Sequence, residues 1–450
     1  FIYEMEKGYL DMELLRFTTA GSVDDGKSTL IGRLLYDSKS IFEDQLEAVE
    51  AASERLGNAE VNLALLTDGL RAEREQGITN DVAYRYFATP KRKFIIADTP
   101  GHIEYTRNMV TGASTADAAI ILVDARNGII EQTKRHSYIA SLLKIDYVIV
   151  AINKMDLVDF SEEVYENIKK EYAHIAELLG LKHVYFIPIS ALKGDNVVNA
   201  SENTPWYKGE TLLHLLEQVP LKEGIDQLPF RFPVQYVVRP QTAEWPDYRA
   251  YAGRVASGSI KVGDKVTVLP SYTESTVSRI DEGTKQIDEA QAPQSISISL
   301  ADDVDVSRGS QIVKSSEIPH VGQQVELMVC WLNHRPLQLR QKYIIKHATD
   351  EVQGLVTAID YKVNINTLEN IHDDQKINMN DIAKITLKVS KPLAYDLYAN
   401  TTGIDMIIDG HSHSTIPCET VRDKDGRPVL LTQTGNYLDN VGKMTLTMDG

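Results

Sequence analysis

The sequence predicts an α/β domain with a parallel sheet wrapped by helices, followed by two β-barrel domains. Three observations support this fold class. In the first half of the chain, apolar strand-like runs alternate with amphipathic helical stretches. This pattern stops at a polar stretch bracketed by prolines, residues 219–229, which is typical of a linker. Beyond it, short strand-like runs continue to about Val389, the texture expected of barrels.

The hydrophobic patterns assign the expected elements to residue ranges. In the first half, strands are expected at residues 14–19, 93–97, 118–123, 147–152 and 184–189. Helices are expected at residues 28–36, 131–143 and 162–179. The second half is expected to begin with strands at residues 232–238, 249–256 and 265–269. The expected domains are an α/β domain at 1–220, barrels at 230–315 and 316–400, and an atypical tail at 401–450.

Length and cysteine content favour a protein of a reducing compartment. The 450 residues are enough for three domains that need no disulfides to stabilise them. The two cysteines, Cys330 and Cys418, cannot form a spaced metal motif, and the cytoplasm is therefore the expected location. The sequence shown contains no run of 18 or more apolar residues and no secretory start, so neither membrane insertion nor export is expected from it.

The chain is strongly acidic. Its net charge is −17, from 47 Lys and Arg against 64 Asp and Glu. Such a charge disfavours broad, sequence-independent contact with phosphate backbones, so no nucleic-acid partner is expected, although a local basic face would be compatible with it. The simplest interpretation is that the acidity keeps a cytosolic protein soluble.

A glycine-rich loop, GSVDDGKS at residues 21–28, joins the first expected strand to the first expected helix. It fits GxxxxGKS/T without a mismatch, in the context that this phosphate-binding motif requires; the rival interpretation is a chance glycine turn. Lys27 is expected to reach the β- and γ-phosphates and Ser28 to ligate Mg2+. Two carboxylates in the loop have no role that the sequence explains. The expected nucleotide contacts are Gly21, Asp24, Asp25, Gly26, Lys27, Ser28 and Thr29.

A second motif, DTPGH at residues 98–102, ends the strand expected at 93–97. Asp98 is therefore expected at the carboxyl edge of the sheet, where a Walker-B-type aspartate holds Mg2+. Gly101 has no Cβ that would keep its N–H away from a γ-phosphate. His102 is the candidate that orients the attacking water, although a histidine after such a turn is, by itself, more often a surface residue.

A third motif, NKMD at residues 153–156, follows the strand expected at 147–152. Asp156 can accept hydrogen bonds from both the N1–H and the exocyclic amine of guanine, a pair of donors that adenine lacks. Asn153 and the Lys154 stem are expected to pack around the purine. Four residues alone match many proteins by chance. Because this match comes third, after two phosphate motifs, it indicates GTP rather than ATP.

Two further segments complete the expected site. The segment Ser190, Ala191 and Leu192 follows the last expected strand, and the Ala191 N–H is expected to face guanine O6. Residues 68–79 are charged and lack a core pattern. Charged loops are usually just solvated, but Thr79 lies where a switch segment places a hydroxyl on Mg2+. The expected metal ligands are Ser28, Thr79 and Asp98, and the expected catalytic residues are Lys27, Thr79, Gly101 and His102.

With these motifs in this order, the chain resembles the translational-type GTPases of elongation factor Tu architecture. Within that group it is similar to the large, GTPase subunits of bacterial sulfate adenylyltransferases. The sequence segments that carry this closer similarity, and that elongation factors in general lack, are residues 16–35, 67–75 and 81–87. Matching patterns follow at residues 253–270, 330–347 and 378–382, so the likeness covers about residues 9–400. The resemblance implies a P-loop GTPase domain followed by two β-barrel domains. Asn80 departs from the family, which usually has an apolar residue after the switch threonine.

The resemblance also implies an activity. In that family, GTP hydrolysis by the large subunit drives a small catalytic subunit to make adenosine 5'-phosphosulfate and pyrophosphate from ATP and sulfate. The chain has one phosphate loop and no SGGxDS-like loop for adenylyl transfer, which fits such a division of labour. GTP, Mg2+, a heterodimer with the small subunit, and no membrane contact are therefore expected. The alternative function is that of a translation factor that binds tRNA or the ribosome. The fold permits this function equally, but the acidity of the chain and the matching sequence segments disfavour it.

The last 50 residues follow a different pattern. Residues 402–414 and 433–437 resemble the final segment of a 5'-nucleotidase-type metallophosphoesterase. His411 and His413 are spaced to hold a divalent metal, but two imidazoles supply only half of a site. The other ligand motifs of that family, DxH, GDxxD and GNHD, do not occur upstream. We expect an inert or foreign tail, with a working metal site as the alternative.

Overall fold

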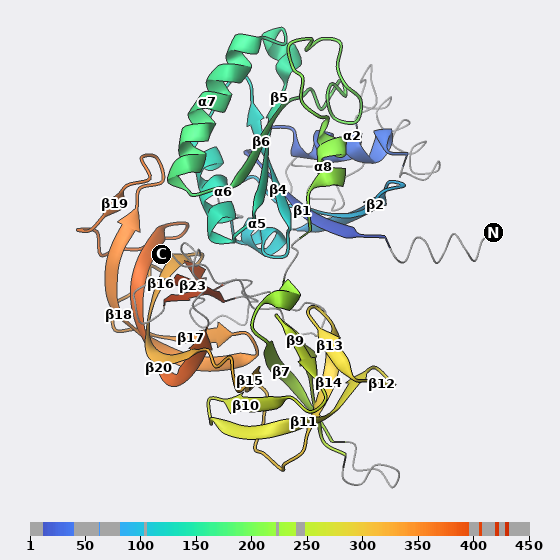
Figure 1. The fold of residues 1–450 in the computed structure, drawn as a ribbon. Coiled ribbons are helices and arrows are strands. Elements are labelled where there is room, and N and C mark those ends of the chain that lie inside the picture. The colour runs from blue at the N-terminus through green and yellow to red at the C-terminus, as the bar shows by residue number, and fades with distance from the viewer. Residues whose placement is uncertain are drawn as a thin grey trace, which may run out of the picture. The chain divides into compact units, whose positions relative to one another are not determined.

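The computed structural model describes residues 12–39, 63, 82–102, 106–221, 225–239 and 248–395, and three short strands beyond them. The chain divides into two compact units (Figure 1). The first comprises residues 1–221 and 365–368, and the second comprises residues 222–364 and 369–450. Among the described residues, no helix has the length and apolarity needed to cross a membrane.

The first unit is built on a six-stranded sheet with the order β2-β3-β1-β4-β5-β6. Five strands are parallel, whereas the edge strand β2 runs antiparallel to β3. The strands are β1 (Leu14–Ala20), β2 (Ala83–Ala88), β3 (Lys93–Asp98), β4 (Ala118–Asp124), β5 (Tyr147–Asn153) and β6 (His183–Pro188). The alternating α/β pattern and the five predicted strands are thus confirmed, each to within about a residue at its ends.

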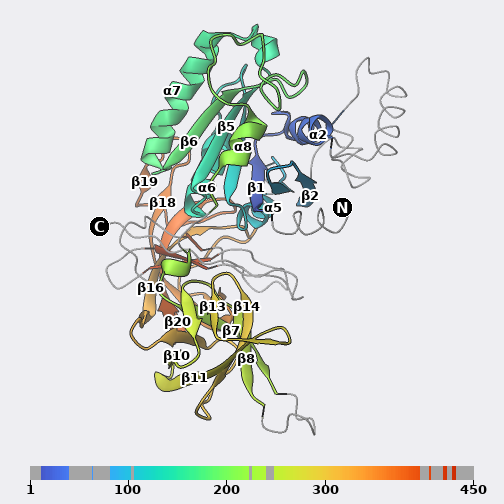
Figure 2. The same ribbon diagram turned by 45° about the vertical axis from the view of Figure 1, so that its right-hand side comes forward.

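Helices cover both faces of this sheet (Figures 1 and 2). They are α2 (Lys27–Asp37), α5 (Thr106–Ala113), α6 (Glu131–Leu142), α7 (Glu162–Leu178) and α8 (Leu212–Gln218). Leu30 of α2 and Leu212 of α8 belong to the same core cluster as Ile120 of β4, whereas Tyr172 of α7 joins the other cluster with Ile121. Helices cover both faces of the sheet, and successive strand residues face opposite sides, so every residue of β4 is buried. The strand is accordingly apolar from Ala118 to Val123.

Ser161 caps the N-terminus of the longest described helix, α7. Its hydroxyl accepts a hydrogen bond from the Val164 N–H at 3.4 Å, so one N–H of the first turn has a partner within the chain. Glu162 and Glu163 place negative charge in the same turn, which the helix dipole favours. These local signals explain why the predicted start of the helix matches the observed one.

The second unit begins with a closed antiparallel barrel. Its strands follow the order β10-β15-β7-β8-β14-β11, and β10 also pairs with β11, which closes the ring. Phe232 and Val234 of β7 are fully buried in its core. The barrel strands are β7 (Arg231–Val238), β8 (Ala250–Arg254), β10 (Lys265–Leu269), β11 (Thr273–Glu282), β14 (Ser295–Leu300) and β15 (Gln311–Lys314). The short strand β12 (Lys285–Ile287) pairs with β11. Strands β9 (Ser259–Lys261) and β13 (Glu289–Gln291) form a separate two-stranded sheet.

A second sheet follows in the same unit, in the order β17-β18-β20-β16-β21, with β19 paired to β18. Its pairs are antiparallel except that β21 runs parallel to β16. In the part of the chain that the structure describes, its strands show no closing pair like β10–β11. Trp331, directly after β16, is buried and donates from Nε1 to the Arg335 carbonyl oxygen at 2.7 Å. The strands of this sheet are β16 (His320–Cys330), β17 (Lys342–His347), β18 (Asp350–Val363), β19 (Asn370–Ile371), β20 (Ile382–Tyr395) and β21 (Asp405–Met406). Strands β22 (Glu419–Arg422) and β23 (Pro428–Leu431) form a separate two-stranded sheet.

Candidate nucleotide-binding site

The three motif loops meet at the carboxyl edge of the first sheet. The strand ladders pair Thr19 with Asp98 and Asp124 with Asn153, so the ends of β1, β3, β4 and β5 lie side by side. β1 lies between β3 and β4. The strands that follow β1 in the chain therefore lie first on one side of it, at β2 and β3, and then on the other side, at β4. Open α/β sheets bind their ligands beyond the carboxyl ends of the strands at such a point.

The glycine-rich loop turns sharply into α2. Gly26 has φ 90°, a left-handed conformation that side chains rarely adopt, and a Cβ there would lie 2.5 Å from Asn153 Nδ2. Lys27 is the first residue of α2 and is buried. Its Nζ donates to the carbonyl oxygens of Gly21 at 3.0 Å and Ser22 at 3.1 Å. The loop thus curls around its own lysine.

Lys27 lies among carboxylates. Burial lowers the pKa of Lys27, but the nearby charges of Asp98, Asp25 and Asp24 favour its protonated form. A buried ammonium group beside backbone N–H groups at a helix N-terminus is a suitable environment for phosphate oxygens. The position of Lys27 fits the role predicted for it.

Asp25 has a structural contact that the sequence did not explain. Its buried carboxylate accepts a hydrogen bond from the Ser22 N–H at 2.5 Å, across the turn of the loop. Burial raises the pKa of Asp25, and the Ser22 bond and the charge of Lys27 oppose this rise. The Asp25 carboxylate therefore stabilises the turn of the phosphate loop through the Ser22 N–H.

Asp98 ends β3 at the same edge and is 1% exposed. His102 follows four residues later and is partly exposed. Thr79, the predicted switch ligand, lies outside the described residues. The structure thus brings Asp98 and Lys27 together.

Gly101 makes the closest approach between two motif loops. A Cβ built on it would overlap Lys27 Nζ and the Gly21 carbonyl oxygen, and would lie 2.9 Å from the carbonyl carbon of Ser22. Real Cβ atoms essentially never show contacts this short. Glycine is therefore required sterically at this position by the phosphate loop itself. The predicted approach of the Gly101 N–H to a γ-phosphate stays a prediction.

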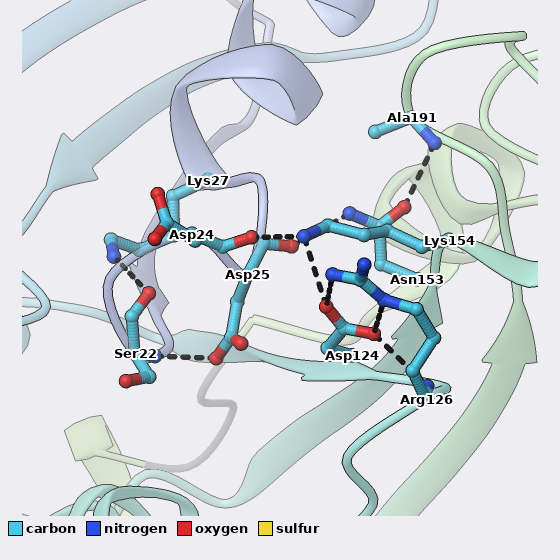
Figure 3. Close-up of polar contacts among 9 residues, drawn as sticks. All are labelled: Ser22, Asp24, Asp25, Lys27, Asp124, Arg126, Asn153, Lys154 and Ala191. Atoms are coloured by element: carbon cyan, nitrogen blue, oxygen red, sulfur yellow. Dashed lines mark hydrogen bonds and ion pairs between the residues drawn. The ribbon is translucent and has the colours of Figure 1, made fainter. Parts of the chain in front are cut away.

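Asn153 connects two loops through its amide (Figure 3). Its Nδ2 donates to the Asp25 carbonyl oxygen at 2.7 Å, and its Oδ1 accepts from the Ala191 N–H at 2.9 Å. Lys154 has a left-handed backbone, with φ 62°, and its Nζ donates to the Asp24 carbonyl oxygen. The Ala191 N–H, predicted to face guanine O6, thus has Asn153 as its partner in this structure.

The remaining predicted contacts surround the same edge. Ser190 is buried and its hydroxyl accepts from the Lys193 N–H at 3.2 Å, whereas Leu192 is about half exposed. Asp156 lies in a single 3-10 turn, Met155–Val158, directly after β5. Ser28 and Thr29 lie in the first turn of α2, next to Lys27.

Sequence reasoning missed one side-chain pair at this edge, Asp124 and Arg126. Asp124 ends β4, is 3% exposed, and accepts from Arg126 Nη2 at 2.6 Å and from Lys154 Nζ at 2.9 Å (Figure 3). One signal could have revealed it. An aspartate at the carboxyl end of an all-apolar strand, next to the strand that carries NKMD, lies at the ligand edge of the sheet.

The tail histidines are not part of this geometry. His411 and His413 lie outside the described residues. Within the described ones, no group of three or more His, Cys, Asp and Glu side chains is arranged to hold a metal ion. The prediction of an inert tail therefore stays a prediction.

Comparison with known proteins assigns the chain to a family. Residues 12–226 match the elongation factor Tu GTP binding domain, and residues 324–418 match the GTP-eEF1A C-terminal domain-like model. Sulfate adenylyltransferase subunit 1 of Alteromonas mediterranea is 50% identical over 92% of this chain and 87% of its own length. The subunit 1 of Pseudoalteromonas atlantica is 52% identical over 91% and 87%. The chain belongs to the sulfate adenylyltransferase subunit 1 family.

The family also includes a longer relative. The bifunctional enzyme CysN/CysC of Mycobacterium tuberculosis is 49% identical over 92% of this chain, which spans 68% of that enzyme. The predicted fold was an α/β P-loop GTPase domain followed by two β-barrel domains of elongation factor Tu architecture. The matches and the strand order confirm the α/β GTP-binding domain and the β-rich domains after it, of which the first is a closed barrel. The resemblance to sulfate adenylyltransferase large subunits is likewise confirmed.

Proposed function

We propose that this chain binds and hydrolyses GTP, and that hydrolysis drives a smaller partner subunit to make adenosine 5'-phosphosulfate and pyrophosphate from ATP and sulfate. The observation that carries the proposal is that the phosphate loop and the NKMD loop meet at one edge of the sheet, where Asn153 joins them. The chain's relatives are named sulfate adenylyltransferase subunit 1. GTP is the nucleotide because Asp156 offers two acceptors to the guanine edge.

The donor set at this edge fits Mg2+. The Ser28 hydroxyl and the Asp98 carboxylate are oxygen ligands of the kind that Mg2+ takes, and both adjoin Lys27. Ser28, Asp98 and, from the sequence, Thr79 are the residues proposed to hold it. When bound, the ion would neutralise charge on the phosphate oxygens.

The protein's own residues act mainly by positioning. Lys27 supplies a buried positive charge for the β- and γ-phosphates, and the backbone of Gly101 approaches the same region because no side chain blocks it. His102 orients the attacking water rather than acting as a strong base. Turnover of the isolated chain is therefore expected to be slow, since related GTPases gain ~10³ to 10⁵ when a partner completes the site.

The proposed partner is the small catalytic subunit, in a heterodimer in the cytoplasm. The chain has no SGGxDS-like loop of its own for adenylyl transfer, so synthesis requires a second protein. The net charge of −17 supports a partner other than nucleic acid.

Co-purification followed by an assay of pyrophosphate release, with and without GTP, tests the proposal. We expect a small ATP-binding subunit to copurify, release to increase with GTP, and the chain alone to make no adenosine 5'-phosphosulfate. An Asp156→Asn complex is the matched control, because its release should respond to xanthosine triphosphate in place of GTP. Copurification with ribosomes instead, or synthesis by the chain alone, would contradict the proposal.

A further inference from the structure

Both carboxylate oxygens of Asp124, the last residue of β4, have donors from nearby cationic residues. Its Oδ1 accepts from the backbone N–H and the Nε of Arg126, each at 3.0 Å. Its Oδ2 accepts from Arg126 Nη2 at 2.6 Å and lies 2.9 Å from Lys154 Nζ. Both carboxylate oxygens of one buried residue are thus directed at two cations, and Lys154 belongs to the guanine motif.

The charge of Asp124 is maintained despite its burial. Burial alone would raise the pKa of Asp124, but the hydrogen bonds from Arg126 and Lys154 outweigh that effect and hold the pKa well below its usual range. Asp124 is therefore a fixed negative charge at the edge of the sheet. A buried charge of this kind fixes the position of the cation that pairs with it.

The cation that it fixes is conformationally strained. Lys154 has φ 62°, a region that non-glycine residues enter only when their surroundings impose it. Its Nζ is held at two points, by Asp124 Oδ2 and by the Asp24 carbonyl oxygen of the phosphate loop. These two contacts stretch the Lys154 stem across the space between the base-reading loop and the phosphate loop (Figure 3).

We propose that Asp124 is a positioning residue for guanine nucleotides, which acts by anchoring Lys154 so that its stem lies where the purine and sugar pack. The inference rests on the proposed GTP-binding function. Arg126 supports Asp124 from the solvent side. Because the stem contacts the nucleotide before and during hydrolysis alike, the anchor contributes to the affinity for GTP and for GDP and not to the rate of hydrolysis.

A double-mutant cycle tests the coupling of Asp124 to Lys154. Asp124→Asn removes the ion pair and should weaken binding of a fluorescent GTP analogue by ~10-fold, the scale of one hydrogen bond between charged groups. KM for GTP should rise by the same factor, and kcat should stay unchanged. In a Lys154→Met background, which keeps the stem without the amine, Asp124→Asn should have an effect of less than ~2-fold, because the group through which it acts is gone.

Asp117→Asn is the matched control. Asp117 precedes the opposite end of β4, and its carboxylate accepts only the Arg16 N–H among the bonds described, at 3.1 Å. The amide oxygen of the variant can still accept this hydrogen bond, so nucleotide affinity should stay unchanged and the melting temperature should change little. If Asp124→Asn does not fold, Asp124→Glu replaces it, since it keeps the charge but displaces it by one methylene.

The outcomes distinguish a failure of the proposed GTP-binding function from a failure of the role assigned to Asp124. A wild-type chain that does not bind GTP would overturn the proposed function itself. A wild-type chain that binds GTP, with Asp124→Asn equally tight, or equally weakened in both Lys154 backgrounds, would overturn the inference alone and make Asp124 a stability residue. A melting temperature that falls with no change in affinity would do the same.

Discussion

Replacing Gly101 with alanine tests whether the close approach of two loops is needed for catalysis. The added Cβ would lie 2.9 Å from the Ser22 carbonyl carbon, whereas ordinary contact begins at 3.4 Å, so the loops must separate by at least about 0.5 Å. The separation must be larger at the Gly21 carbonyl oxygen, which lies closer still. Misplacement of this order in a reacting site costs ~10²-fold in rate. We therefore expect GTP hydrolysis to fall by ~10²-fold in Gly101→Ala.

The assay is single-turnover hydrolysis at saturating GTP, together with GDP affinity and melting temperature. GDP affinity should fall by less than the rate, because Lys27 and the phosphate loop also serve the β-phosphate of GDP, whereas hydrolysis depends in addition on the position of the γ-phosphate. Gly283→Ala is the matched control: Gly283 has φ 61° but nothing within 4 Å of its added Cβ, so it costs stability without touching the site. Hydrolysis by Gly101→Ala within ~3-fold of wild type would refute the steric reasoning, and an equal loss in Gly283→Ala would mean that the rate only reports stability.

Three further substitutions test other residues. Asp156→Asn should lower GTP affinity and improve binding of xanthosine triphosphate relative to GTP, measured by competition; unchanged GTP affinity would make the guanine assignment wrong. His102→Ala should leave GTP binding near normal and lower single-turnover hydrolysis by ~10² or more, the scale of one positioned catalytic group; a parallel fall in binding would make His102 structural. Replacing both His411 and His413 with alanine should change neither GTP hydrolysis nor the metal content measured on the purified protein. Loss of a stoichiometric transition metal, or of a 5'-nucleotidase activity in Mn2+ or Zn2+, would show that the tail is a working metal site.

The α/β half of the fold could be predicted because its signals are local. β4 and β5 are continuous apolar runs flanked by polar residues, and α7 carries its own cap and acidic first turn. β2 was not predicted as a strand, because as an edge strand it leaves Tyr84 and Tyr86 exposed and shows no apolar run. The helix α8 was missed because its seven residues are too few for a clear helical period.

The parts of the site that could not be predicted depend on contacts between distant segments. The motifs indicated Lys27, Asp98 and Asn153 by type and spacing. The role of Asp124 depends on Lys154, which is 30 positions away and reaches it only because β4 and β5 pair in register. Likewise, Asp25 gains its contact from a turn that brings the Ser22 N–H onto its carboxylate.

The amide of Asn153 has a kinetic consequence. Both of its ends have protein partners, the Asp25 carbonyl oxygen and the Ala191 N–H, so contacts within the chain hold the phosphate loop and the Ser190–Leu192 loop to the NKMD loop. Loops that the chain itself holds in this way need less ordering when a nucleotide binds, and the guanine half is common to GTP and GDP. Both nucleotides should therefore associate at similar rates. Which one the empty protein takes up would follow their relative concentrations in the cell, so that the state of the subunit would follow the energy supply available for sulfate activation.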